Sequence, residues 1–280
     1  MVVPGRTNEY NLQTLMRKLL FEFLTIVILF VSTWYILRQI DWMSVFKIEK
    51  ITKNTEGKLG NVFWNVMKKN EIEIDAAAIK SPIDSILQRI CIKNNFNKDK
   101  IKIHLIRKDE VNAFAIPDNN IVVYTGLIEA CKNEEEFSGI LCHEIAHIEK
   151  HHVMNKLVKD VGLSILISMS KGSGNAEIIK EAIKNLSSTA YDREMERTAD
   201  ITAVEYLIKA NIDPKPFADF LDSLSKKENL PKQLYWISNH PESKERSAYL
   251  NEYIKDKVVM KDSIVGNLKW ELLKNKLKQN

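Results

Sequence analysis

The longest run of apolar positions lies near the start of the chain. Residues 19–37 carry one charged side chain, Glu22, close to the beginning of the run. About 17 or more apolar residues can cross a bilayer as a helix, and Trp34 and Tyr35 suit the membrane interface at the far end. We therefore expect one transmembrane helix over 19–37. A cleaved signal peptide and a buried core helix are the rival interpretations.

Beyond this run, the pattern first predicts a helix and then strands. A helix is expected over 81–93, with Ser81 as its N-cap and Pro82 at its first position. Strand-like runs follow at 101–107, 111–116 and 120–124. The Pro-Asp-Asn-Asn segment at 117–120 is a turn signal between the last two runs.

The apolar period becomes helical after these strands. A helix is expected to begin at Asn133, with Glu136 completing a capping-box pattern. Its apolar face is formed by Phe137, Ile140, Leu141 and Ile148. A second helix is expected over 193–210. Between the two helices, the apolar patch within 160–190 is expected to pack in the core, with a substrate-facing lid as the alternative.

Composition and charge narrow the class of protein. Apolar residues make up 45% and charged residues 28% of the 280 positions, which favours a globular domain over disorder. The net charge of +4 is spread along the chain, so nucleic-acid binding is not indicated. Three cysteines are too few for a disulfide framework, and Cys142 is expected to be a small buried residue.

The helix after Asn133 carries the segment His-Glu-Ile-Ala-His. Residues i and i+4 share one helical face, so His143 and His147 can reach the same metal ion. Zinc prefers such ligands in tetrahedral geometry, and a catalytic site leaves one position for water. Glu144 can stand beside that water and take its proton during attack on a peptide carbonyl. The spacing predicts a zinc-dependent peptidase with one zinc per chain.

A third protein ligand is needed to complete such a site. In the pattern HExxHxxGxxH, the glycine position is Lys150 and the last histidine position is Val153, so that pattern fails. A glutamate from a later helix is the other source, and Glu196 in Glu-Arg-Thr-Ala-Asp fits it. Asp200, one turn on, is expected to hydrogen-bond a ligand histidine.

The remaining histidines of this region receive plainer interpretations. His104 is expected to be a hydrogen-bonded histidine of the sheet. His151 and His152 are out of register with the ligand face and are expected at the surface or beside a ligand. The whole HExxH match could also be a chance pair of histidines on a solvated helix. The apolar face, the preceding strands and the downstream glutamate favour the zinc site.

Several blocks, in this order, resemble one family of zinc metallopeptidases. The family includes the HtpX-type heat-shock proteases, the CAAX prenyl proteases and periplasmic quality-control proteases, and is metallopeptidase family forty-eight. The matching blocks are VNAFAIPDNNIVVYTGLIEA, HEIAHIEKHH, YDREMERTAD and NHPESKER. One departure is Pro-Asp-Asn-Asn, where relatives usually have glycine-rich turns. The multi-span membrane bodies of some relatives are absent.

The resemblance implies an α+β minigluzincin fold, mostly helical with a small sheet. It places His240 and Arg246 at family positions in the late His-Pro-x4-Arg element. The expected organisation is a flank at 1–18, the anchor at 19–37, a linker at 38–70, the peptidase domain at 71–255 and a helical tail at 256–280.

Two roles are open for His240. It could stabilise the oxyanion formed when water attacks the carbonyl, or it could fill the open position on zinc and hold the enzyme latent. The plain alternative is a loop histidine that packs against Arg246.

The resemblance also implies polypeptide substrates that are misfolded or membrane-associated. We expect an endopeptidase of envelope protein quality control, in a bacterial inner membrane with the peptidase domain outside the cytoplasm. The alternative is a zinc-binding chaperone-like or scaffolding protein with a latent site. The intact Glu144 favours the enzyme. Prenyl-protein processing is disfavoured because no multi-span chamber is present.

Overall fold

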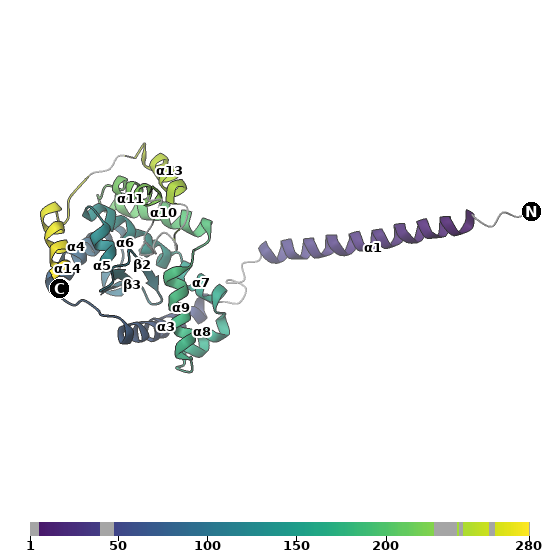
Figure 1. Ribbon diagram of the computed structural model, residues 1–280, viewed down its shortest axis with the longest axis horizontal. Coiled ribbons are helices and arrows are strands. Elements are labelled where there is room, and N and C mark those ends of the chain that lie inside the picture. Colours follow the sequence, from purple (N-terminus) through teal and green to yellow (C-terminus); the bar gives the residue numbers. More distant parts are fainter. Residues whose placement is uncertain (1–5, 40–47, 227–239, 241–242, 258–260, 280) are drawn as a thin grey trace, which may run out of the picture. The chain divides into compact units, whose positions relative to one another are not determined.

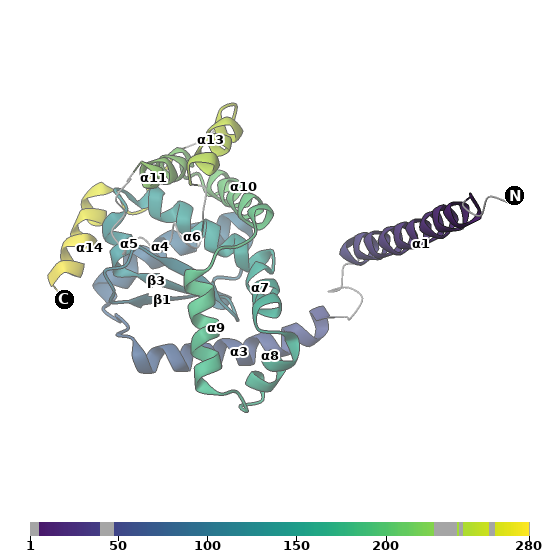
Figure 2. The ribbon, with the colours of Figure 1, turned by 45° about the vertical axis from the view of Figure 1, so that its right-hand side comes forward.

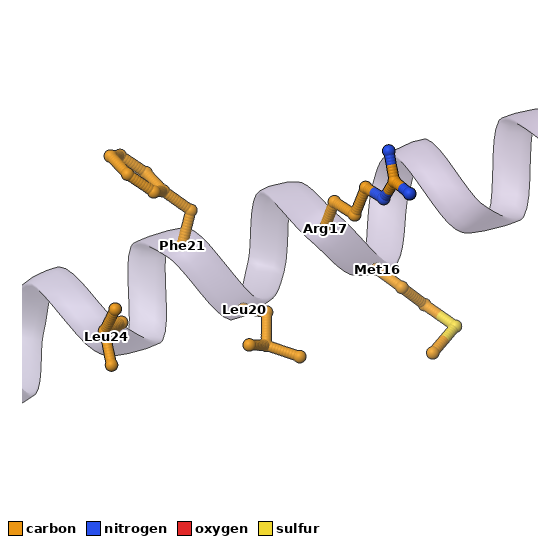
Figure 3. A pocket seen from close by; sticks show the side chains of 5 residues that line it. All are labelled: Met16, Arg17, Leu20, Phe21 and Leu24. Atoms are coloured by element: carbon orange, nitrogen blue, oxygen red, sulfur yellow. The ribbon is translucent and has the colours of Figure 1, made fainter.

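The computed structural model describes residues 6–39, 48–226, 240, 243–257 and 261–279 (Figure 1). The chain forms two compact units, 1–52 and 53–280. Most of the first unit's described residues belong to helix α1 (Arg6–Gln39), and large apolar side chains in its 15–35 part are exposed. Figure 3 shows Arg17 and Phe21 projecting from one side of this helix and Met16 and Leu20 from the other.

The transmembrane prediction needs a correction. Within the described ranges, no helix has both the length and the apolar character needed to cross a bilayer. The run 19–37 is helical as expected and lies within α1.

The second unit is built around a small sheet. Strands β1 (Lys102–Ile106), β2 (Ala113–Ile116) and β3 (Asn120–Tyr124) confirm the three predicted strands. Their order is β1-β3-β2, with β1 parallel and β2 antiparallel to β3. Asp118 and Asn119 have φ angles of 66° and 55° in the β2–β3 turn. Positive φ at both positions suits a tight hairpin, and asparagine and aspartate tolerate it well.

Helices cover both faces of this sheet (Figure 2). Leu105, Ile121 and Val123 pack in one apolar cluster with α4 (Ala77–Asn94) and α6 (Glu134–Glu149). Alternate residues Ile106, Phe114 and Val122 join a second cluster on the other face. That cluster includes residues of α3 (Ile48–Asn70), α7 (His152–Asp160), α8 (Leu163–Ser170) and α9 (Ala176–Ser188). The two-residue period of the strands therefore separates two cores.

The structure corrects the predicted start of one helix and shows how the 160–190 region packs. Helix α4 begins at Ala77, so Pro82 lies inside it and Ser81 is not its N-cap. The preceding alanines favour helix, and a proline this near the start removes only one backbone donor. The 160–190 region is α8 and α9, and Leu166 and Met169 are buried in the second cluster, as core packing predicts.

Two of the remaining helices pack on α6, and a third packs on those two. The short elements are η1 (Lys98–Lys100) and α5 (Thr125–Ala130). Helices α10 (Arg193–Lys209) and α11 (Lys215–Ser225) pack directly on α6, and α13 (Ser243–Ile254) packs on both α10 and α11. The fold is α+β and mostly helical, as predicted, and α6 is central to its packing.

Helix α14 (Asn267–Gln279) is joined to the same core near the C-terminus. Its Trp270 is fully buried, and the indole N–H donates to the Cys131 carbonyl at 3.3 Å. The buried carboxylate of Glu134, in the first turn of α6, accepts the backbone N–H groups of Ile264, Val265 and Gly266. The segment leading into α14 is thus fixed to the start of α6.

Candidate active site

Helix α6 begins as the sequence predicts. The Asn133 side chain accepts the Glu136 N–H at 2.9 Å, and the Glu136 carboxylate accepts the Lys132 N–H at 2.7 Å. These bonds satisfy donors at the helix start, where the dipole also favours negative charge. Two turns further on, His143, Glu144 and His147 are fully buried.

Four ligand-type side chains converge beside α6. One ligand atom from each of His143, His147, Glu196 and His240 lies within 4.8 Å of the others, and all four residues are buried. His143 Nε2 is 3.0 Å from His147 Nε2 and 3.2 Å from His240 Nδ1. The Glu196 Oε1 atom is 2.8 Å from His240 Nδ1 and 3.4 Å from His147 Nε2.

This arrangement fits a zinc ion. Zinc–nitrogen bonds of about 2.0–2.1 Å place the corners of a tetrahedron about 3.3 Å apart, close to the spacings between these atoms. Three imidazoles and one carboxylate are also the donor types that zinc prefers. The structure thus brings the predicted ligands together, and it adds His240 as a fourth ligand-type side chain.

Asp200 occupies the supporting position that the sequence predicts. Its Oδ1 atom is 2.9 Å from His143 Nδ1. A proton on Nδ1 leaves the Nε2 lone pair free for a metal, and a carboxylate at this distance favours that tautomer. Burial lowers the pKa of His143 to about 3, although the hydrogen bond to Asp200 opposes this shift. The ring is therefore neutral, as a metal ligand must be.

Arg246 connects the parts of the site. Its guanidinium donates from Nε and NH2 to the two carboxylate oxygens of Asp200, at 2.8 and 2.7 Å. The Nη1 atom of Arg246 donates to the His240 carbonyl at 2.9 Å and lies 3.0 Å from Glu196 Oε2. Burial raises the pKa of Glu196, but His240 and Arg246 outweigh it and hold that pKa well below its ordinary value. Pro241, the proline of the His-Pro-x4-Arg element, lies outside the described residues.

Glu144 lies beside the cluster rather than in it. Its Oε2 atom accepts the Ala115 N–H from β2 at 3.1 Å, and its Oε1 atom is 3.6 Å from His240 Nε2. One carboxylate oxygen is therefore held by the strand, while the other faces the cluster. This is the placement that a general base beside a metal requires.

The other histidines match their plainer interpretations. His104 contacts Glu73 at 3.1 Å and Asn120 at 2.9 Å, so it is a hydrogen-bonded histidine of the sheet. His151 is exposed. His152 is buried, and its Nδ1 atom lies 3.1 Å from His147 Nδ1, where it can orient that ring.

The sequence analysis did not single out Tyr191. Its ring lies against the rings of His147 and His240, with centroid distances of 4.1 and 5.8 Å. Burial, reinforced by the charges of Glu144 and Glu196, raises the pKa of its hydroxyl well above the ordinary value. Its position within the quoted block YDREMERTAD was the available signal, but no spacing rule relates it to the helical motif.

Comparisons with known proteins agree with this geometry. Peptidase family M48 matches residues 77–254. Mitochondrial metalloendopeptidase OMA1 of Schizosaccharomyces pombe is 24% identical over 184 residues, which are 65% of this chain and 55% of that protein. Metalloendopeptidase OMA1 of Bos taurus is 28% identical over 167 residues, 54% of this chain and 32% of that protein.

A bacterial protein is also similar to this chain. The β-barrel assembly-enhancing protease of Escherichia coli K12 is 23% identical over 181 residues, 60% of this chain and 37% of that protein. The chain thus covers between about a third and just over half of the length of these relatives. Since the family match covers more than half of the 280 residues, the chain belongs to peptidase family M48.

Proposed function

We propose that the protein cleaves peptide bonds within misfolded or membrane-associated proteins, as an endopeptidase of protein quality control. The carrying observation is the convergence of His143, His147 and Glu196 on one point beside the Glu144 carboxylate. The substrate class draws support from the relative whose name refers to β-barrel assembly.

Each residue of the site has a separate role in hydrolysis. His143, His147 and Glu196 would hold zinc, which supplies Lewis acidity to polarise a water or carbonyl oxygen. Glu144 takes the proton of the attacking water and later passes it to the leaving amine. The Ala115 N–H keeps Oε2 of Glu144 in place, which leaves Oε1 to accept the proton. Asp200 and Arg246 orient the ligands.

The test compares casein cleavage and zinc content in two variants on the same helix. Glu144→Gln should retain about one zinc per chain and lose at least about a hundredfold in rate, because an amide cannot accept the water's proton. Glu149→Gln, on an exposed side chain at the end of α6, should keep the wild-type rate. Full activity in Glu144→Gln would place the base elsewhere.

The second candidate, a latent zinc-binding chaperone or scaffold, has one observation in its favour. His240 stands among the ligands, where it would leave no position for water. A chaperone should suppress aggregation of an unfolded client equally well as wild type and as Glu144→Gln. An enzyme should clear the client in the wild type only.

Natural substrates and location can be tested together. Glu144→Gln, expressed in the native cell, should retain bound clients because it cannot cleave them. We propose that these clients are envelope proteins and that the catalytic domain acts outside the cytoplasm, in association with the membrane. Crosslinking followed by fractionation and mass spectrometry would identify them, and a set made up of cytosolic proteins would contradict this location.

A further inference from the structure

The hydroxyl of Tyr191 has no role in the zinc site described so far. Tyr191 lies two residues before α10, the helix that carries Glu196. The side chain is 5% exposed, and among the described residues its hydroxyl has no hydrogen-bond partner. A buried hydroxyl left without a partner costs free energy, so such groups are uncommon in folded proteins.

The ring is held firmly in the wall of the site. It lies 4.1 Å from the His147 ring and 5.8 Å from the His240 ring, between centroids. On another side, Lys156 Nζ lies 5.2 Å from the ring centroid and donates to the Ala190 carbonyl at 3.1 Å. The lysine therefore fixes both the ring and the backbone just before it. A phenol held in this way is oriented before any substrate arrives.

Among the described residues beside the cluster, two other donors, His240 Nδ1 and Arg246, already have partners. His240 Nδ1 contacts Glu196 and His143, and Arg246 contacts Asp200, Glu196 and the His240 carbonyl. The Tyr191 hydroxyl is a neutral donor at physiological pH and has no described acceptor. A bound peptide offers such an acceptor in its carbonyl oxygens.

We propose that Tyr191 is a further catalytic residue, whose hydroxyl donates a hydrogen bond to the carbonyl oxygen of the scissile peptide. This inference rests on the proposed peptide hydrolysis. Water oxygen bonds to the carbonyl carbon, the π electron pair moves onto the carbonyl oxygen, and Glu144 takes the water's proton. The Tyr191 O–H stabilises that oxygen without giving up its own proton. The electron pair on that oxygen then re-forms the carbonyl as the carbon–nitrogen bond breaks, and the amine leaves with the proton from Glu144.

The test is Tyr191→Phe in the full-length zinc-loaded protein, with Tyr206→Phe as a matched control. Tyr206 lies on α10 and packs edge-on against Phe96, in the core cluster rather than at the metal ligands. Tyr191→Phe should lower kcat by about a hundredfold, with KM and zinc content unchanged. Its Tm should not fall, because the substitution removes a hydroxyl without a described partner. Tyr206→Phe should keep the wild-type kcat.

Three results would overturn the inference. One is a kcat for Tyr191→Phe within about threefold of wild type. Another is a loss of kcat that accompanies zinc loss, and a third is a fall in Tm, since either would indicate a structural role.

The affinity for a phosphinic peptide gives a readout that does not depend on turnover. Its tetrahedral oxygens mimic the oxyanion, so Tyr191→Phe should bind it about a hundredfold more weakly than wild type. An inactive wild-type protein would contradict the proposed hydrolysis, while this affinity would still decide the role of Tyr191. Equal affinities for wild type and Tyr191→Phe would overturn it.

Discussion

Each histidine of the cluster uses its two ring nitrogens for different contacts. His143 and His147 turn Nε2 toward the cluster and Nδ1 toward a supporting side chain, Asp200 or His152. His240 does the reverse, with Nδ1 in the cluster and Nε2 3.6 Å from Glu144. It therefore contacts both the ligand set and the base, and both contacts are expected to block the attacking water.

This double contact leads us to expect that His240 acts as a latch. His240→Ala should raise the cleavage rate on an unfolded substrate such as casein, because it frees one position for water beside Glu144. An oxyanion donor predicts the opposite, a loss in kcat of about a hundredfold. Zinc content measured beside the rate separates both effects from loss of metal.

The control for this variant is His151→Asn. His151 is exposed and has a φ angle of 57°, a conformation that asparagine adopts readily. It should leave the rate and zinc content unchanged. A rate for His240→Ala equal to wild type would remove His240 from the mechanism and leave the contact with Arg246 as its role.

At the scale of elements, the most local signals were the most predictable. The α6 cap, the i,i+4 histidines and the β2–β3 turn depend on neighbours within four residues, and all match the prediction. Helix α3 was expected to be part of a linker. Its Gly60 lowers helix propensity, yet a Cβ there would lie 2.6 Å from the Pro117 carbonyl of the hairpin. Only tertiary packing explains that glycine.

The contacts that complete the site were harder to predict for the same reason. Tyr191 reaches the ligands from the segment before α10, and the Ala115 N–H reaches Glu144 from a strand 29 residues away. Such contacts depend on how separate elements pack, and no residue spacing encodes them. The resemblance to a family identified His240 and Arg246, but not the contacts that each makes.

Alanine is expected to have opposite effects on stability at two glycines. It should destabilise the protein at Gly139, where α6 contacts α11, and stabilise it at Gly57. A Cβ at Gly139 would lie 2.4 Å from the Phe217 side chain. Although alanine favours helix by up to about 1 kcal/mol, overpacking costs about 1–3 kcal/mol. Gly139→Ala should therefore lower the free energy of unfolding, as measured by urea denaturation.

The matched control is Gly57→Ala in α3. Its added Cβ would meet only Asp118, at 3.6 Å, which is an ordinary contact. This variant should gain the helix propensity and be slightly more stable than wild type. If the Gly139→Ala and Gly57→Ala proteins were equally stable, α6 and α11 would have to separate readily. In that case α11 would not hold α6 in position.

At the scale of the whole molecule, the folded unit extends past the family match. The match ends at residue 254, whereas α14 contributes Trp270, Leu273 and Leu277 to the same core as α6. Glu134 also holds the segment before α14 through backbone N–H groups. The tail is therefore expected to support the start of the helix that carries the zinc ligands.

This expectation can be tested with two substitutions on α14. Trp270→Ala removes a fully buried ring that contacts Phe137 of α6, at 5.5 Å between centroids. Such a change should cost about 3–5 kcal/mol, a large part of the net stability of a domain. Leu268→Ala, 78% exposed, should change stability by less than about 0.5 kcal/mol. Urea unfolding at fixed zinc concentration would measure both.

Because Phe137 lies about two turns before His143, Trp270→Ala should also weaken zinc retention during dialysis against a chelator. If Trp270→Ala matched Leu268→Ala in both measurements, α14 would be an appendage rather than part of the peptidase core.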